Sequence, residues 1–110
     1  MILITGGLGF LGCNLAKLLC DGGEKVLLTS NRNAEVPPLI APFLERNLKI
    51  TPLDVTSLDN ISRVIRDFGV KSIVHAAIRS EKGGTPLYQA MHVNVTGTIN
   101  VLEAAQRAGI

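Results

Sequence analysis

Three glycines, Gly6, Gly9 and Gly12, stand three residues apart near the start of this 110-residue chain. In such a series the first glycine allows a sharp turn, the second lets the backbone approach a phosphate, and the third lets a helix pack closely. A helix that begins here presents free N–H groups, around Phe10 and Leu11, and the positive end of its dipole to an anion. No Gly-Lys-Ser/Thr follows, which excludes an NTPase phosphate loop. The turn therefore predicts a site for the pyrophosphate of a dinucleotide.

This interpretation requires a strand before the glycines and a helix after them, since the series alone could be a structural turn. Apolar periodicity and turn residues supply both, and they divide the remaining chain in the same way. The predicted strands are residues 1–5, 25–29, 48–53 and, within 70–77, the segment Lys-Ser-Ile-Val-His. The predicted helices are residues 9–19, 57–68 and 86–108. Ser57 is suited to cap the second helix, Gly69 to end it, and Pro86 to open the third.

Apolar strands that alternate with helices predict an α/β fold, a Rossmann-like, doubly wound parallel sheet with helices on both faces. We expect four strands in the order 3-2-1-4, within a single domain over residues 1–110. The apolar stripes should be the buried faces of the helices. In the first helix this stripe is Leu11, Leu15, Leu18 and Leu19. In the third helix Leu87, Met91, Val95, Thr98, Leu102 and Ala105 are expected to form core or a helix–helix interface.

The end of the second strand bears on the choice between NADP and NAD. Ligands of open α/β sheets bind at the carboxyl ends of the strands, and an acidic residue about 20 positions after the glycines binds the ribose hydroxyls of NAD. Here that stretch contains Ser30, Asn31 and Arg32, without a carboxylate. A carboxylate would repel the 2′-phosphate of NADP, whereas a guanidinium would attract it. The stretch favours NADP over NAD, unless Arg32 is only a solvated loop residue.

The spacing Gly-x-x-Gly-x-x-Gly resembles that of the short-chain dehydrogenase/reductase superfamily. Residues 5–12, Thr-Gly-Gly-Leu-Gly-Phe-Leu-Gly, resemble its extended branch, the NAD-dependent epimerases and dehydratases. Three further segments agree: Leu-Asp-Val-Thr at 53–56, Val-His-Ala-Ala at 74–77, and Asn-Val-Thr-Gly-Thr-Ile-Asn-Val-Leu-Glu-Ala-Ala at 94–105. The resemblance extends to about residue 109. It implies the N-terminal, cofactor-binding half of an enzyme that acts on a nucleotide sugar or a similar substrate.

The same resemblance implies roles for residues outside the glycine turn. Asp54, with Val55 beside it, would contact the adenine, and the small side chains of Ala76 and Ala77 would let the cofactor approach the fourth strand. Asn94 would support the active site through a water or a backbone contact. The alternatives are a turn or cap role for Asp54, ordinary strand packing for the alanines, and a polar core position for Asn94.

The family's catalytic residues have no counterpart in this chain. They are a Tyr-x-x-x-Lys pair and a Ser or Thr after the fifth strand, in which the tyrosine is the general acid/base. The single tyrosine, Tyr88, is followed four residues later by His92 and lies on the wrong element. His75 resembles a structural element of the family and not an acid–base group. We therefore assign no catalytic residue and expect a fragment, truncated before strand five and lacking the substrate domain.

A missing fifth strand would leave the fourth strand as an open apolar edge, and such edges promote association. Homo-oligomers could form through this edge or through the long helix 86–108. The parent enzyme would be an epimerase, dehydratase or reductase that transfers hydride. The alternative function is a non-catalytic dinucleotide-binding regulatory or sensor module whose sheet is completed by another chain.

Composition narrows the class of protein further. The chain has 11 basic and 9 acidic residues, a balance that predicts no nucleic-acid partner and no membrane-surface partner. No apolar stretch reaches the roughly 18–20 residues of a membrane span, and no signal peptide is visible, so a cytoplasmic location is expected. Cys13 and Cys20 would lie about 10 Å apart on the first helix, too far for a disulfide. No Cys/His spacing indicates a metal site.

Overall fold

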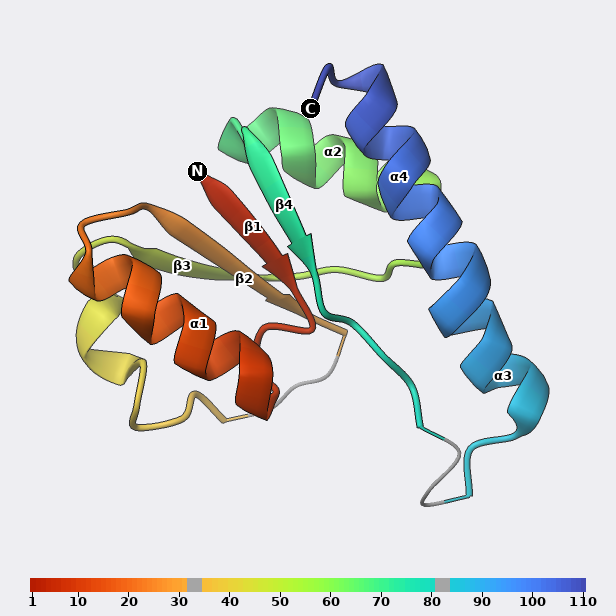
Figure 1. The fold of residues 1–110 in the computed structure, drawn as a ribbon, viewed down its shortest axis with the longest axis horizontal. Coiled ribbons are helices and arrows are strands. Elements are labelled where there is room, and N and C mark those ends of the chain that lie inside the picture. The colour runs from red at the N-terminus through yellow and green to blue at the C-terminus, as the bar shows by residue number, and fades with distance from the viewer. Residues whose placement is uncertain (32–34, 81–83) are drawn as a thin grey trace.

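A computed structural model describes residues 1–31, 35–80 and 84–110 of the chain, so Arg32 lies outside the described residues. Four parallel strands form one sheet: β1 Ile2–Thr5, β2 Val26–Ser30, β3 Leu48–Pro52 and β4 Ser72–His75. They lie in the order β3-β2-β1-β4 (Figure 1). The predicted α/β, doubly wound sheet and its strand order are thereby confirmed.

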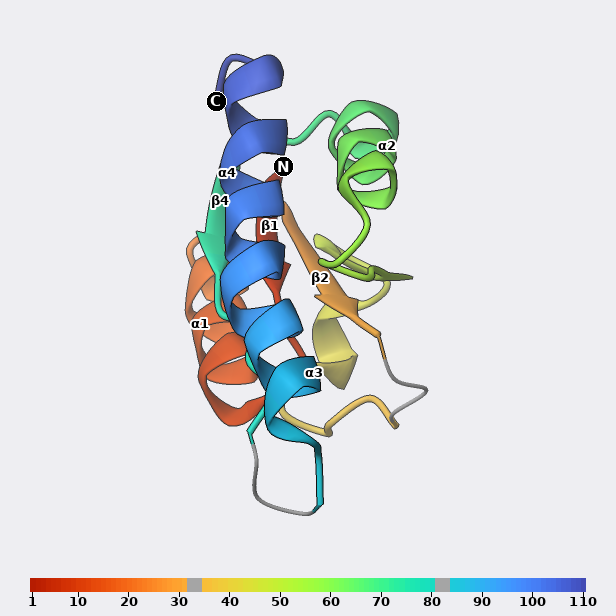
Figure 2. The same ribbon diagram turned by 90° about the vertical axis from the view of Figure 1, so that its right-hand side faces the viewer.

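Helices cover both faces of this sheet, α1 on one face and α2 and α4 on the other (Figures 1 and 2). Their bounds are α1 Phe10–Asp21, α2 Leu58–Phe68, α3 Leu87–Met91 and α4 Gly97–Arg107. A short 3₁₀ turn, Ala41–Phe43, precedes β3. The prediction of one regular helix over residues 86–108 was wrong in one respect, because a π-helical turn, His92–Thr96, joins α3 to α4.

The central strands are apolar on both sides because each side of the sheet carries its own core. Successive side chains of a strand point to opposite faces. Leu3 and Leu27 face the core under α2 and α4, whereas Ile4 and Leu28 face the core under α1. This double burial explains why β1 and β2 read as continuous apolar runs.

The buried face of α1 differs from the predicted leucine stripe. Leu11 and Leu18 are 65% and 70% exposed, while the buried positions are Gly12, Cys13, Ala16 and Cys20. The reason is a close approach of the helix to the turn before it. A methyl group on Gly12 would lie 2.6 Å from the Cα of Gly7. At this separation only small side chains fit between the first turn of α1 and the glycine turn, whereas Leu15 and Leu19, further along α1, are partly buried against the core.

Of the two roles expected for the apolar face of the last helix, core or a helix–helix interface, the core role is corrected. Its larger apolar side chains are exposed, namely Leu87, Met91, Val95 and Leu102. The buried positions are Ala90, Gly97, Val101 and Ala104. The edge of β4 is likewise open, since β4 ends the sheet and Val74 is 37% exposed.

Local signals at the ends of α2 behave as predicted. The hydroxyl of Ser57 accepts a hydrogen bond from the backbone N–H of Asn60 at 3.2 Å, and Gly69 ends the helix at φ +61°. Within the described part of the chain no helix is long and apolar enough to cross a membrane. No cluster of His, Cys, Asp or Glu in these residues could hold a metal ion.

Candidate functional site

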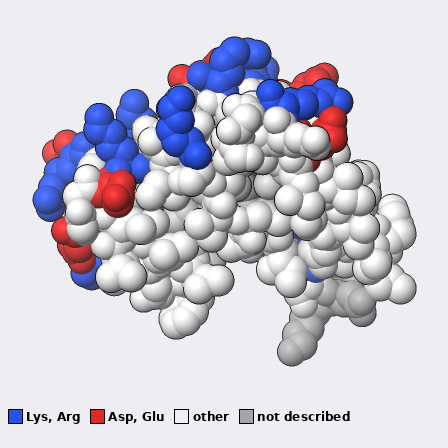
Figure 3. All heavy atoms as spheres, turned by 45° about the horizontal axis from the view of Figure 1, so that its top comes forward, with Lys and Arg blue, Asp and Glu red and all other residues white. Residues whose placement is uncertain are grey.

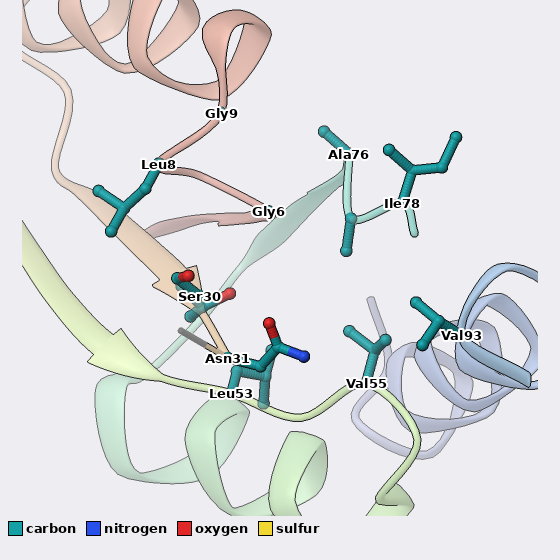
Figure 4. A pocket seen from close by; sticks show the side chains of 12 residues that line it. Gly6, Leu8, Gly9, Ser30, Asn31, Leu53, Val55, Ala76, Ile78 and Val93 are labelled. Carbon is teal, nitrogen blue, oxygen red and sulfur yellow. The ribbon is translucent and has the colours of Figure 1, made fainter. Parts of the chain in front are cut away.

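A cavity of about 290 Å³ opens at the carboxyl ends of all four strands. Residues that follow each strand line it, as Figure 4 shows: Gly6, Leu8, Gly9, Thr29, Ser30, Asn31, Leu53, Val55, Ala76, Ala77, Ile78 and Val93. The chain runs from β1 to β3 on one side and then returns to place β4 on the other side of β1. The cavity therefore lies at the topological switch point, where open α/β sheets bind their ligands.

Gly6 shapes this cavity because the chain turns there in a conformation that favours glycine. Its φ is +66°, and a methyl group at this position would lie 2.7 Å from the Cα of Ala77 and 2.8 Å from the carbonyl oxygen of Ala76. The N–H of Gly7 donates to the carbonyl of Thr29 at 2.8 Å. The turn thus joins the end of β1 to the ends of both neighbouring strands.

The N-terminus of α1 supplies backbone donors rather than side chains. Gly9 is the N-cap and provides no side-chain cap, so the first N–H groups of the helix have no intrahelical acceptor. The side chains of Phe10 and Leu11 are 89% and 65% exposed and do not line the cavity. Gly12 lies buried against Gly7. These positions can serve an anion only through their backbone N–H groups and the helix dipole.

Charge is absent from the cavity lining among the described residues, which include no Lys, Arg, Asp or Glu there. Figure 3 shows the charged side chains gathered mainly along one rim of the molecule. At the end of β2 the lining residues are Thr29, Ser30 and Asn31. The Asn31 side chain points into the space between Gly6 and Val55 (Figure 4). A bound phosphate would meet dipoles here rather than a side-chain cation.

Asp54 stands at a turn ahead of α2. Its Oδ1 accepts hydrogen bonds from the N–H and the hydroxyl of Thr56, at 2.9 and 2.7 Å. Its own N–H donates to Oδ1 of Asn60 at 2.9 Å. Asp54 does not line the cavity itself, whereas its neighbours Leu53 and Val55 do. The turn role that the sequence allowed for Asp54 is present in the structure.

A chain of hydrogen bonds runs behind the Ala76–Ala77 segment. The buried Oγ1 of Thr5 accepts from the N–H groups of Ala76 and Ala77 at 3.1 and 3.2 Å. It also lies 2.6 Å from Nδ1 of His75, whose Nε2 lies 3.0 Å from Oγ1 of Thr98. Burial lowers the pKa of the His75 imidazole, which favours its neutral form.

Asn94 lies on the π-helical turn and faces the segment after β4. Its Oδ1 accepts from the N–H of Arg79 at 2.8 Å, and its Nδ2 donates to the carbonyl of Arg79 at 2.9 Å. The side chain therefore makes two hydrogen bonds to the backbone of Arg79, and it does not itself line the cavity. The preceding residue, Val93, is part of the lining.

Several lining residues were not predicted from the sequence: Leu8, Thr29, Leu53, Ile78 and Val93. Each stands next to a predicted position, at the end of a strand or within a motif. Adjacency to those motifs is the one signal that could have indicated them, because their side chains carry no distinctive chemistry.

Comparison with known proteins agrees with this geometry. The chain is 35% identical over 99% of its length to the 3 beta-hydroxysteroid dehydrogenase/Delta 5-->4-isomerase of Mycobacterium tuberculosis, and covers 29% of that protein. It is 27% identical over 99% of its length to the dTDP-L-rhamnose 4-epimerase of Burkholderia thailandensis, and covers 31% of it. The Bordetella bronchiseptica enzyme WbmG, solved in complex with NAD and UDP, superposes with a TM-score of 0.85 at 30% identity. In that comparison 99% of this chain and 34% of WbmG are covered.

The chain thus spans about a third of the length of these relatives and matches their N-terminal part. The family model described as the NAD dependent epimerase/dehydratase family matches residues 2–110. With its sheet order, its glycine turn and the cavity at the strand ends, this chain belongs to the NAD dependent epimerase/dehydratase family.

Proposed function

We propose that this chain binds a nicotinamide dinucleotide in the cavity at the strand ends and forms the cofactor-binding part of a hydride-transferring enzyme. The observation that carries the proposal is the packing of left-handed Gly6 on Ala76 and Ala77 beside the uncapped N-terminus of α1. That arrangement offers free N–H groups with no side chain in front of them. The similar enzyme WbmG was solved in complex with NAD, which supports a nicotinamide dinucleotide as the ligand.

Each part of the dinucleotide has a set of residues suited to it. The pyrophosphate would lie over Gly9, against the N–H groups of Phe10, Leu11 and Gly12. The adenine would lie beside Asp54 and Val55, and the nicotinamide beside Ala76 and Ala77. Asn94 would position the segment after β4 through the Arg79 backbone. A cavity near the lower end of the ~300–1,000 Å³ range suits part of such a ligand, with the rest extending over the open margin.

NADP is the proposed form of the cofactor. The adenine ribose would lie near Ser30 and Asn31, and no described residue at this end of β2 carries the carboxylate that would repel a 2′-phosphate. Arg32 follows directly in the sequence and would attract that phosphate. The NAD bound in WbmG makes NAD the competing outcome.

The proposed substrate class is a nucleotide sugar or a similar molecule. The dTDP-L-rhamnose 4-epimerase relative and the UDP in the WbmG complex support it. A 3β-hydroxysteroid is the second candidate, because the mycobacterial relative of that name is 35% identical to this chain. No catalytic residue is proposed among these 110 residues. Incubation of the protein in its natural full length with NADP and either nucleotide sugars or a 3β-hydroxysteroid, with analysis of the products as well as of NADPH, would distinguish the two classes, because epimerisation and dehydration leave no net NADPH.

Association through apolar surface is the last part of the proposal. Leu87, Met91, Val95 and Leu102 leave apolar side chains exposed along α3, the π-helical turn and α4, and β4 leaves an open edge at the end of the sheet. Exposed apolar area of this kind favours burial against another surface. Light scattering should show dimers or larger species whose population falls when Leu102 is changed to Gln.

Binding is tested by calorimetric titration with NADP and with NAD. A ligand at 100 times its Kd should stabilise the fold by about 2.7 kcal/mol. Gly9→Ala should weaken binding at least about tenfold, because φ −76° suits any residue while the added methyl group would face the phosphate. Gly22→Ala is the matched control, since Gly22 caps the other end of α1 at φ −77°.

Three outcomes would contradict parts of this proposal. Absence of heat with either dinucleotide would overturn the binding site. Tighter binding of NAD than of NADP would overturn the NADP preference alone. Equal losses in Gly9→Ala and Gly22→Ala would show that the turn does not hold the phosphates.

A further inference from the structure

The hydrogen bonds between Thr5, His75 and Thr98 admit one arrangement of protons. The hydroxyl of Thr98 lies 2.6 Å from the carbonyl oxygen of Asn94 and must donate to it, since a carbonyl only accepts. With its single proton used, Thr98 Oγ1 can only accept from Nε2 of His75 at 3.0 Å. His75 therefore carries its proton on Nε2.

The remaining hydrogen bonds of this series, those at Nδ1 of His75, follow from that tautomer. A neutral imidazole has one N–H, so Nδ1 of His75 is an acceptor. The hydroxyl of Thr5 donates to it at 2.6 Å. The lone pairs of the same oxygen then accept from the N–H groups of Ala76 and Ala77. One proton order satisfies every group from the Asn94 carbonyl to the two peptides that pack on Gly6.

We propose that His75 is a positioning residue that holds the Ala76 and Ala77 peptides against Gly6 only as a neutral imidazole, so that protonation of His75 weakens dinucleotide binding. The inference rests on the proposed function, because it concerns the same cavity. It assigns His75 no contact with the cofactor. His75 acts through Thr5.

Protonation removes the acceptor that the Thr5 hydroxyl needs. An imidazolium is a donor at both nitrogens, so Nδ1–H would point at an oxygen whose lone pairs already accept from two peptides. The hydroxyl proton would have no acceptor, and Thr5 is fully buried, so water cannot replace one. The imidazolium then competes with the N–H groups of Ala76 and Ala77 for the lone pairs of Thr5 Oγ1. The Ala76 N–H keeps a second acceptor, the backbone carbonyl of Thr5 at 3.2 Å, so displacement of Ala77 is the expected consequence. Ala76 and Ala77 both line the cavity, and both lie against Gly6.

No charged group in the described structure offsets this effect at His75. β4 contacts β1 on one side and α4 on the other, and these present the uncharged Thr5 and Thr98. The helical segment 87–107 also carries three titratable or charged groups apart from its tyrosine: His92, Glu103 and Arg107. Glu103 and Arg107 pair with each other at 2.7 Å, and His92 is exposed. Burial alone lowers the pKa of His75.

The first test measures the Kd for NAD between about pH 8 and pH 5. NAD is the probe because it lacks the 2′-phosphate monoester, which itself titrates near pH 6. We expect the Kd to be constant at high pH and to rise by up to about tenfold per unit below the pKa of His75. His75→Gln should bind more weakly at pH 8 and lose this dependence. His92→Gln, the matched control, should retain it.

The second test needs no ligand. Imidazole ¹⁵N spectra of the wild-type chain should show the neutral His75 protonated on Nε2. The amide resonances of Ala76 and Ala77 should move with the same midpoint as His75, while those of Gly23 should not. Thr98→Ser should preserve these signals, and Thr98→Val should change the tautomer balance.

These measurements separate the two proposals. NAD binding that is independent of pH would overturn the role of His75 and leave the cofactor site intact. A neutral His75 protonated on Nδ1 would overturn it whether or not NAD binds. Failure to bind either NAD or NADP at every pH would overturn the proposed function, and unmoved Ala76 and Ala77 amides would then also overturn the present inference.

Discussion

Gly6 and Ala77 come so close that a methyl group on Gly6 would lie 2.7 Å from the Cα of Ala77. The contact joins the chain leaving β1 to the chain leaving β4, the neighbouring strand, and both segments line the cavity. Glycine is required at position 6 for two reasons, the left-handed φ of +66° and this contact.

Replacing Gly6 with Ala should lower the free energy of unfolding for two reasons, the left-handed backbone and the overlap with Ala77. Gly23→Ala tests the backbone effect alone. Gly23 has φ +86° and no atom within 4 Å of an added methyl group, so Gly23→Ala should cost about 1–2 kcal/mol from the backbone alone. Gly6→Ala should cost about 1–3 kcal/mol more, from overlap with Ala77. Urea unfolding measures both, and only Gly6→Ala should abolish NADP binding. Equal free energies of unfolding for the two variants would contradict the contact.

The cap on α2 gives a prediction about stability without a change at the cavity. Ser57→Ala removes the hydroxyl that accepts from the N–H of Asn60 and should lower the free energy of unfolding by about 1 kcal/mol. Ser62→Ala, inside the same helix, should change it by no more than about 0.5 kcal/mol. Thermal or urea unfolding compares the two variants. A larger effect at Ser62 would refute the cap.

Both cysteines should react slowly in the folded chain. Cys13 and Cys20 are buried on α1 and unpaired. Burial raises the pKa of both thiols; for Cys20 the charge of Asp21 adds to this and that of Arg46 opposes it. A thiol reagent should label them far faster in denaturant than in buffer.

Labelling of Cys13 should also damage the glycine turn. Its Sγ donates to the carbonyl of Gly7 at 3.3 Å. In Cys20→Ser, slow labelling of Cys13 should proceed together with loss of NADP binding. Retained affinity after complete labelling would show that the turn does not depend on this contact.

Folding stability should decline on mild acidification because of His75. Burial lowers its pKa in the folded chain below the ordinary value of about 6.5, so the unfolded chain takes up the proton first. The contribution of His75 to the free energy of unfolding is therefore fully present above about pH 6.5, and it is lost as the pH falls below that value. Unfolding between about pH 7.5 and 5.5 measures the slope. His75→Gln should flatten it and His92→Gln should not; identical slopes in all three proteins would exclude His75 as its source.

The sequence predicted the features that depend on local chemistry. Gly6 indicated the turn, Ser57 the cap and Gly69 the helix end. Each of these residue types meets a conformational or hydrogen-bonding need of the backbone next to it in sequence. Strand order followed from alternation and from the resemblance of the motifs.

Features that depend on the distance between elements were not predictable. Leu11 and Leu18 are apolar enough to be core, yet they are exposed. The positions buried at the start of α1 are Gly12 and Cys13, because the helix lies so close to the Gly7 turn there. The π-helical turn contains Asn94, whose side chain bonds the Arg79 backbone, a tertiary contact that local sequence does not encode. The sequence pattern indicates which residues are hydrophobic, but it does not give the distances between the packed elements.

The pairing of β1 with β4 has a consequence for how the molecule acquires its site. Thr5 and His75, which meet across this pair, are 70 positions apart in the chain. Closing so long a loop costs conformational entropy before stabilising contacts between the strands can form. Parallel pairings between distant segments are therefore slow to form. The dinucleotide site should therefore be absent from early folding intermediates. A cofactor present during refolding should leave the folding rate unchanged and slow the unfolding rate instead.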